Sequence, residues 1–123
     1  MTQTNQSADL LISHIIHGIE ELKGQETILM DLRKIENTVC DYFIICEGTS
    51  NTQVSAIVNS IRKQVSKAIQ DKPINIEGTG NSEWVLMDYG NIVVHVFQKK
   101  IREYYDIEGL WGDAVTTELT LNN

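Results

Sequence analysis

The step Gly48-Thr49-Ser50 is the most enzyme-like feature of this sequence. It joins a predicted strand to a predicted helix, and backbone N–H groups at the start of a helix can hold a phosphate. Enzymes that transfer nucleotidyl groups also need a strand-borne pair of carboxylates, one residue apart, that holds two divalent metals. The predicted strands carry Asp31, Asp41 and Asp88 singly, and the step lacks the lysine of a P-loop. The step is therefore interpreted as a capped helix start, with nucleotide binding as the alternative.

His95 lies in the middle of a predicted strand and is a candidate general base. A general base needs a substrate proton within reach and a carboxylate that orients it, and Asp88 across a predicted hairpin is the expected neighbour. No nucleophile accompanies the two residues. A structural histidine is therefore favoured over a catalytic one, and a role in shaping a surface stays open.

The histidines and cysteines do not predict a metal site. His14 and His17 form one near pair without a cysteine close by, and Cys40 and Cys46 are too few for a disulfide scaffold. Both cysteines are interpreted as reduced thiols of a cytoplasmic protein, with Cys46 buried. The start of the chain lacks the features of a secretory signal, and no apolar run is long enough to cross a membrane. No catalytic residue, cofactor or metal is assigned.

A cluster of aromatic and acidic residues in the C-terminal third indicates a binding surface. Two tryptophans and three tyrosines fall between positions 84 and 111, with acidic residues interleaved. Aromatic anchors ringed by charge are typical of protein-binding hot spots. Stacking on RNA bases is the rival use, and the acidic neighbours argue against it. The residues predicted to bind a partner are Trp84, Asp88, Tyr89, His95, Arg102, Tyr104, Tyr105, Asp106, Glu108 and Trp111.

The length and charge of the chain limit its function. The chain has 123 residues, which corresponds to one domain, and 10 basic against 17 acidic residues give a net charge of −7. Affinity for phosphate backbones comes from clusters of lysine and arginine, so this chain is expected to make little direct contact with nucleic acid. An acidic surface favours a basic partner, and many basic partners are ribosomal or nucleic-acid-binding proteins.

Hydrophobic periodicity predicts a single α/β domain with the element order α-β-β-α-β-β-β-α. Helices are predicted at 8–23, 52–70 and 98–105, and strands at 27–32, 41–46, 74–76, 84–88 and 92–97. The strand at 92–97 is apolar on both faces and is expected in the centre of a mixed sheet of about five strands with flanking helices. Residues 1–7 and 115–123 are expected to be flexible on either side of a domain at 8–114.

Three motifs resemble the signature of the Iojap family, the ribosome silencing factors. They lie in the family's order and spacing at residues 41–50 (DYFIICEGTS), 84–97 (WVLMDYGNIVVHVF) and 102–114 (REYYDIEGLWGDA). The resemblance covers most of residues 8–114. It implies a fold similar to the nucleotidyltransferase fold without the catalytic carboxylates, in agreement with the missing carboxylate pair.

The resemblance also implies a function. A family member is expected to bind the large ribosomal subunit through ribosomal protein L fourteen, at the face that meets the small subunit. It would block subunit joining by its bulk, without catalysis, and would repress translation under nutrient limitation. A homodimer is also implied, and no membrane or small-molecule partner is expected. Two alternatives stay open: a nucleotidyltransferase-like enzyme that uses residues 48–50, and a homodimeric scaffold whose aromatic cluster is the dimer seam.

Overall fold

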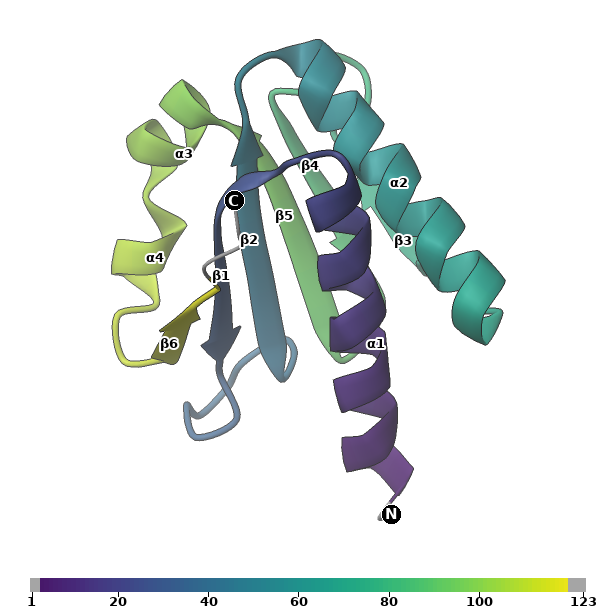
Figure 1. Ribbon diagram of the computed structural model, residues 1–123. Helices are drawn as coiled ribbons and strands as arrows, with labels where there is room; N and C mark the ends of the chain where they lie inside the picture. The colour runs from purple at the N-terminus through teal and green to yellow at the C-terminus, as the bar shows by residue number, and fades with distance from the viewer. Residues whose placement is uncertain (1–2, 120–123) are drawn as a thin grey trace.

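The computed structural model describes residues 3–119 as one α/β unit (Figure 1). Its elements are α1 (Gln3–Glu21), β1 (Gln25–Asp31), β2 (Tyr42–Gly48), α2 (Asn51–Ile69), β3 (Asn75–Glu77), β4 (Trp84–Asp88), β5 (Ile92–Gln98), α3 (Lys99–Tyr105), α4 (Ile107–Leu110) and β6 (Val115–Glu118). The strands form one mixed sheet in the order β3-β4-β5-β2-β1-β6. Within residues 3–119, no helix combines the length and the apolar content needed to span a bilayer.

The two central strands pair in parallel, and every other pair in the sheet is antiparallel. All of β2 is buried, and β5 is buried except at its last residue. A strand that is covered on both faces must be apolar on both faces, which is why these two segments read as continuous hydrophobic runs. The predicted central position of residues 92–97 is confirmed, and so is the α/β fold class.

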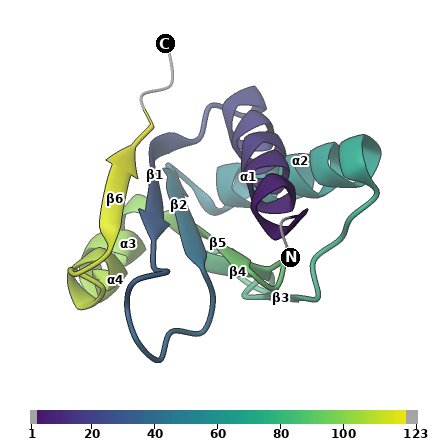
Figure 2. The ribbon, with the colours of Figure 1, turned by 90° about the horizontal axis from the view of Figure 1, so that it is seen from below.

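The two long helices cover one face of the sheet, and the two short helices lie on the other face (Figure 2). The first face is packed by aliphatic residues of α1 and α2 against alternate residues of β2, β4 and β5. The second face buries Phe43, Ile45 and Phe97 beneath α3, α4 and the loop between β1 and β2. Cys46 belongs to the first core and Cys40 to the second, so the sheet separates these two buried, free thiols.

Gly18 allows α1 and α2 to cross at close range. A Cβ atom on Gly18 would lie 2.8 Å from the Cα atom of Ile61, which is backbone of α2. We expect Gly18→Ala to lower the free energy of unfolding by about 1–3 kcal/mol, because this overlap outweighs the better helix propensity of alanine. Urea denaturation measures the change. Gly80→Ala is the control, since no atom lies within 4 Å of a Cβ at that position. Equal stability of the two variants would contradict the close crossing.

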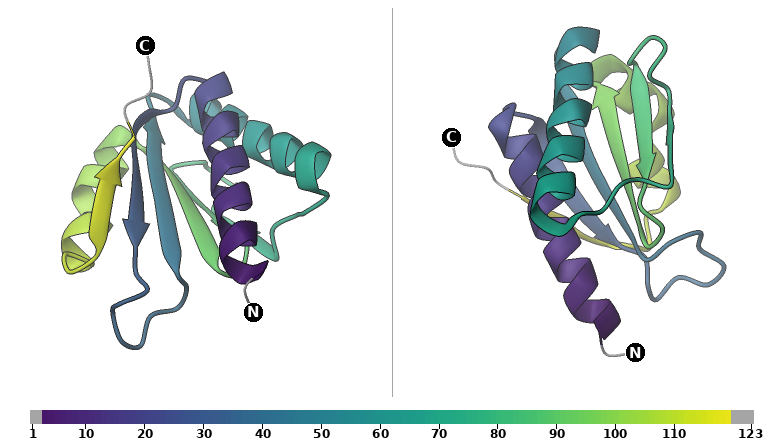
Figure 3. Two further views of the ribbon diagram at one scale, coloured as in Figure 1. Left: turned by 60° about the horizontal axis from the view of Figure 1, so that its bottom comes forward. Right: turned by 90° about the vertical axis from the view of Figure 1, so that its right-hand side faces the viewer.

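Three elements differ from the predictions. Residues 115–118, expected in a flexible tail, form β6, which pairs with β1 at the edge of the sheet (Figure 3). Every residue of β6 is exposed, so backbone hydrogen bonds rather than an apolar pattern define this strand. The one-turn helix α4 is too short to show a periodicity. Helix α1 begins at Gln3 rather than at residue 8. Residues 1–2 and 120–123 of the expected flexible ends lie outside the described residues.

Candidate functional site

Aromatic rings from β4, β5 and α3 form a continuous cluster on the second face of the sheet. The indole of Trp84 stacks on Phe97 with ring centroids 4.8 Å apart, and it contacts Tyr105 at 4.9 Å. The ring of Tyr105 meets Tyr104 edge-on at 5.0 Å. Tyr104 is 79% exposed and Tyr105 is 53% exposed. The cluster therefore has a buried floor on the sheet and an outer rim that faces solvent.

His95 is buried beneath this cluster and contacts both Trp84 and Phe43. Its Nδ1 accepts a hydrogen bond of 3.1 Å from the indole Nε1–H of Trp84. Its ring meets Phe43 edge-on at 4.6 Å, and Phe43 in turn meets Trp111 edge-on at 5.6 Å. Burial lowers the pKa of His95 to about 4, because the charged imidazolium would lose its hydration among these rings. His95 is therefore neutral at physiological pH.

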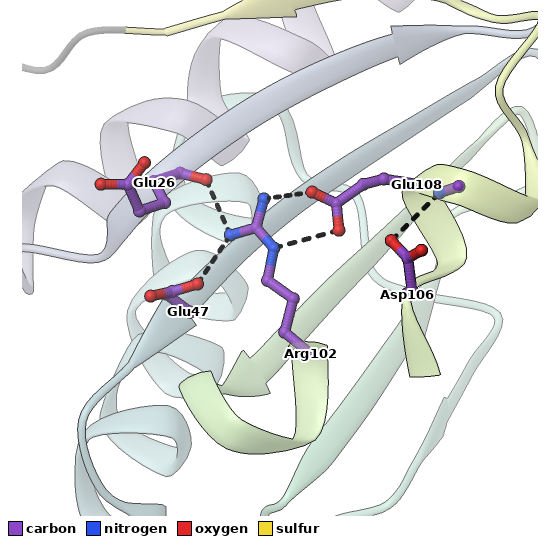
Figure 4. A network of polar contacts seen from close by, with 6 residues as sticks. Glu26, Glu47, Arg102, Asp106 and Glu108 are labelled. Carbon is purple, nitrogen blue, oxygen red and sulfur yellow. Dashed lines mark hydrogen bonds and ion pairs between the residues drawn. The ribbon is translucent and has the colours of Figure 1, made fainter. Parts of the chain in front are cut away.

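Arg102 of α3 is buried and ties four segments of the chain together (Figure 4). Its guanidinium donates two hydrogen bonds to the Glu108 carboxylate, at 3.2 and 2.9 Å. The remaining nitrogen donates to Glu47 Oε1 at 3.0 Å and to the backbone carbonyl of Glu26 at 2.8 Å. These ion pairs raise the pKa of Arg102 despite the opposing effect of burial. The planar guanidinium suits such a set of acceptors, which a lysine could not reproduce.

The same network explains the local shape of the chain beside it. Glu26 sits at an irregularity of β1, where its positive φ of 48° turns its carbonyl oxygen toward Arg102. Asp106 has a positive φ of 45°, ends α3 and caps α4 by accepting a hydrogen bond from the Gly109 N–H (Figure 4). Arg102 and Asp106 therefore fix where α3 and α4 lie, and with them the exposed rim.

An open pocket of about 440 Å³ lies beside the Arg102 network. Five of its eight lining residues are acidic: Glu26, Glu47, Glu103, Asp106 and Glu108. The lining also contains Lys99 and Arg102, and Arg102 is already engaged with Glu47 and Glu108. The surface next to Tyr104 and Tyr105 therefore carries an excess of negative charge, which suits a cationic group of a partner better than a phosphate.

The structure brings together most of the residues that the sequence predicts for the binding surface. Asp88 is half-buried at the far end of β4 from Trp84. The residues at or near the rim of the cluster, exposed or half-buried, are Trp84, Tyr104, Tyr105, Asp106, Glu108 and Trp111. His95 and Arg102 are buried beneath that rim and touch the rim residues from inside. The rim residues therefore form an exposed surface, and the buried side chains of His95 and Arg102 support it from beneath.

Tyr89 is separated from the cluster. It lies in the other core, packed with the residues of α1 and α2, and only 7% of it is exposed. The expected contact between Asp88 and His95 is wrong: Asp88 Oδ1 accepts the Gly90 N–H at 2.7 Å, and His95 pairs with Trp84 instead. Asp88 therefore stabilises the hairpin turn.

Two apolar residues of this face were not among the predicted site residues. Leu86 is half-buried on β4, and Leu110 of α4 is 77% exposed. The alternation of a strand places Leu86 on the same face as Trp84, so the sequence contained a signal for it. The position of Leu110 depends on the cap at Asp106, for which the sequence pattern gives no guide.

The Gly48-Thr49-Ser50 step is the capped helix start that the sequence predicts. Ser50 Oγ accepts the Gln53 N–H at 3.1 Å, and Gln53 Oε1 accepts the Thr49 N–H at 2.8 Å. The Gln53 side chain also donates to the carbonyl of Leu22, which ties the step to the end of α1. The N–H groups of Thr49 and Gln53, two of those that could hold a phosphate, are therefore used within the chain.

Comparisons with known proteins agree with this architecture. The family model "Ribosomal silencing factor during starvation" matches residues 4–123. A ribosomal silencing factor of Bacillus subtilis is 42% identical over 101 residues, covering 81% of this chain and 83% of the relative. A crystal structure from Chromobacterium violaceum superposes with a TM-score of 0.79 at 38% identity and covers 85% of each chain.

A more distant relative comes from mouse. It is named "Mitochondrial assembly of ribosomal large subunit protein 1" and is 36% identical over 73 residues, covering 58% of this chain and 32% of the relative. Its match is confined to part of both chains, whereas the family model spans nearly the whole of this one. The chain belongs to the family of ribosomal silencing factors.

Proposed function

We propose that this protein binds the large ribosomal subunit in the cytoplasm through ribosomal protein L fourteen and blocks joining of the small subunit. It would repress translation under nutrient limitation by occupying a surface, without a catalytic step. Membership of the silencing-factor family supports the role, and the name of the mouse relative supports the large subunit as the partner. The proposal of ribosomal protein L fourteen as the partner is supported by the family resemblance of the three motifs.

The observation that carries the proposal is the exposed aromatic rim beside an acidic pocket. Tyr104, Tyr105 and Leu110 expose much of their apolar surface, and five acidic residues line the adjoining pocket. Aromatic anchors supply most of the affinity at protein interfaces, and acidic groups around them steer a basic partner into place. A standard interface buries roughly 800 Å² of each partner, which a domain of this size can provide.

The same surface can also serve a homodimer, which the family resemblance implies. If the two copies meet through the rim around Tyr104, dimerisation and ribosome binding exclude each other. Light scattering across a concentration series, repeated with saturating large subunits, separates a dimer that dissociates on binding from one that uses another surface. Nucleotide binding at residues 48–50 is not favoured as a second function, because the N–H groups of Thr49 and Gln53 are used within the chain and the step lacks the lysine of a P-loop.

Tyr104→Ala tests the proposed surface. We expect a roughly tenfold loss of affinity for large subunits, because a ring that anchors a protein interface contributes about 1–2 kcal/mol. Co-sedimentation with purified large and small subunits measures the affinity and the selectivity. Ile74→Ala is the matched control, since Ile74 is 74% exposed but lies beside Asp88, at the end of β4 away from Trp84.

Two results would contradict the proposal at different levels. If the wild-type protein sediments free of large subunits and leaves joined ribosomes intact, the proposed function is wrong. If the wild type binds and Tyr104→Ala binds equally well, the function stands and the interface lies elsewhere. Binding to isolated ribosomal protein L fourteen tests the identity of the partner independently of the ribosome.

A further inference from the structure

The hydrogen bond between Trp84 and His95 fixes which nitrogen of the histidine carries its proton. The indole Nε1–H can only donate, so Nδ1 of His95 must be unprotonated to accept it. A neutral imidazole then carries its proton on Nε2. Within residues 3–119 this Nε2 is buried and has no hydrogen-bond partner. His95 therefore maintains one good hydrogen bond and one unpaired buried N–H.

An unpaired buried N–H destabilises a folded protein, because the group loses its hydration and gains nothing in return. The rings around His95 are Phe43, Trp84 and Phe97, at centroid distances of 4.6, 6.0 and 6.1 Å. An apolar side chain at position 95 would remove this unpaired N–H and would leave unpaired only the indole N–H of Trp84, a residue that is half-buried rather than buried. Stability alone therefore does not account for a histidine at this position.

The histidine acts on Trp84, because it accepts the hydrogen bond of the Trp84 indole. Its indole is half-buried, with one side stacked on Phe97 and a tilted contact to Tyr105 of the exposed rim. Stacking fixes the plane of the ring, but a half-turn about the Cβ–Cγ bond would keep that plane and exchange the two edges of the indole. The hydrogen bond to His95 selects one of these two orientations and so determines which edge of the indole faces a partner.

We infer that His95 is a positioning residue that holds the Trp84 indole in its partner-binding orientation, and that this role, rather than stability, is what the histidine serves. The inference rests on the proposed function, because it takes Trp84 to be part of the surface that contacts the ribosome. A preorganised anchor binds more tightly, since less conformational freedom is lost on association.

Two substitutions separate positioning from stability. His95→Phe keeps an aromatic ring but removes the acceptor, whereas His95→Asn places an amide oxygen near the position of Nδ1 but loses the ring packing. At pH 7 we expect the denaturation midpoint of His95→Phe to equal or exceed that of the wild type and to exceed that of His95→Asn. We expect affinity for large subunits to fall about fivefold to tenfold in His95→Phe, the value of one lost hydrogen bond, and less in His95→Asn.

The order of stability is thus opposite to the order of affinity, and a purely structural residue cannot produce this reversal. The chain contains two tryptophans, so an ¹⁵N–¹H spectrum shows two indole N–H signals. The Trp84 signal should shift and exchange faster with solvent in His95→Phe, while the Trp111 signal serves as an internal reference. Should His95→Phe not fold, His95→Leu provides the same test with a smaller side chain.

The result that overturns the inference is equally definite. If His95→Phe binds large subunits with wild-type affinity, or if affinity and stability fall in the same order in both variants, His95 has no positioning role. In a Trp84→Phe background the His95→Phe substitution should cause no further loss, because the donor is already gone. If the wild type does not bind large subunits at all, the proposed function fails, and the indole signals still report on the hydrogen bond.

Discussion

Arg102→Leu is expected to lower the free energy of unfolding by about 3–5 kcal/mol, the cost of removing one partner from a buried ion pair. The variant leaves Glu47, only 6% exposed, without its cationic partner, and it removes a donor from the Glu26 carbonyl. It also releases the Glu108 carboxylate, which holds α4 against α3. Chemical denaturation at pH 7 measures the change.

A matched set of variants identifies the cause of this loss. Arg62→Leu removes an exposed arginine of α2 and is expected to change stability by no more than about 0.5 kcal/mol. Adding Glu47→Gln to Arg102→Leu should recover part of the loss, because the unpaired buried charge is then neutral. An Arg102→Leu variant within about 1 kcal/mol of the wild type would show that the buried network does not stabilise the fold.

The burial of Arg102 illustrates what the sequence does not reveal about the site. The sequence predicts a surface position for this arginine, because its neighbours are tyrosines and acidic residues and because arginine is seldom buried unless it is paired. Its partner Glu47 lies 55 residues earlier in the chain, on β2, and its carbonyl partner lies 76 residues earlier, on β1. Only the pairing of β1, β2 and β5 brings these groups together, and no local pattern encodes that pairing.

The elements show the same division between local and non-local information. Helix α2 was predictable because its periodic apolar residues and its capping serine lie within one short stretch of the sequence. Strand β5 was predictable because it is a continuous apolar run. Strand β6 was not predictable, because its register with β1 depends on backbone hydrogen bonds between segments far apart. The aromatic segment was found from composition, yet composition does not assign its members to a face.

The alternation of side chains along a strand predicts the face of the sheet for two of these aromatic residues. Trp84 and Tyr89 are five positions apart, an odd number, so a strand and its tight turn place them on opposite sides of the sheet. The structure agrees, with Trp84 on the second face and Tyr89 in the core beneath α1 and α2. Which face is open to a partner still depends on where α3 and α4 pack, and this depends on Arg102.

The second large effect is a loss of stability in mild acid that originates at His95. Burial lowers the pKa of His95 from about 6.5 to about 4, so between these values the unfolded chain binds a proton that the folded chain does not. The contribution is fully present above pH 6.5 and declines as the pH falls toward 4. The expected decrease in the free energy of unfolding over this range is about 3 kcal/mol.

Urea denaturation at half-unit steps from pH 7 to pH 4 measures this dependence. The difference between the wild type and His95→Phe isolates the histidine, because the carboxylates titrate in both proteins. Asp31 does not enter this window: its hydrogen bond to Arg33 lowers its pKa below 3.8, so its contribution is lost only in stronger acid. His17→Gln replaces a half-exposed histidine of α1 and serves as the control for a charge change alone. If His95→Phe loses stability in acid as steeply as the wild type, the imidazole is not held neutral by burial, and the acceptor role inferred for its Nδ1 loses its basis.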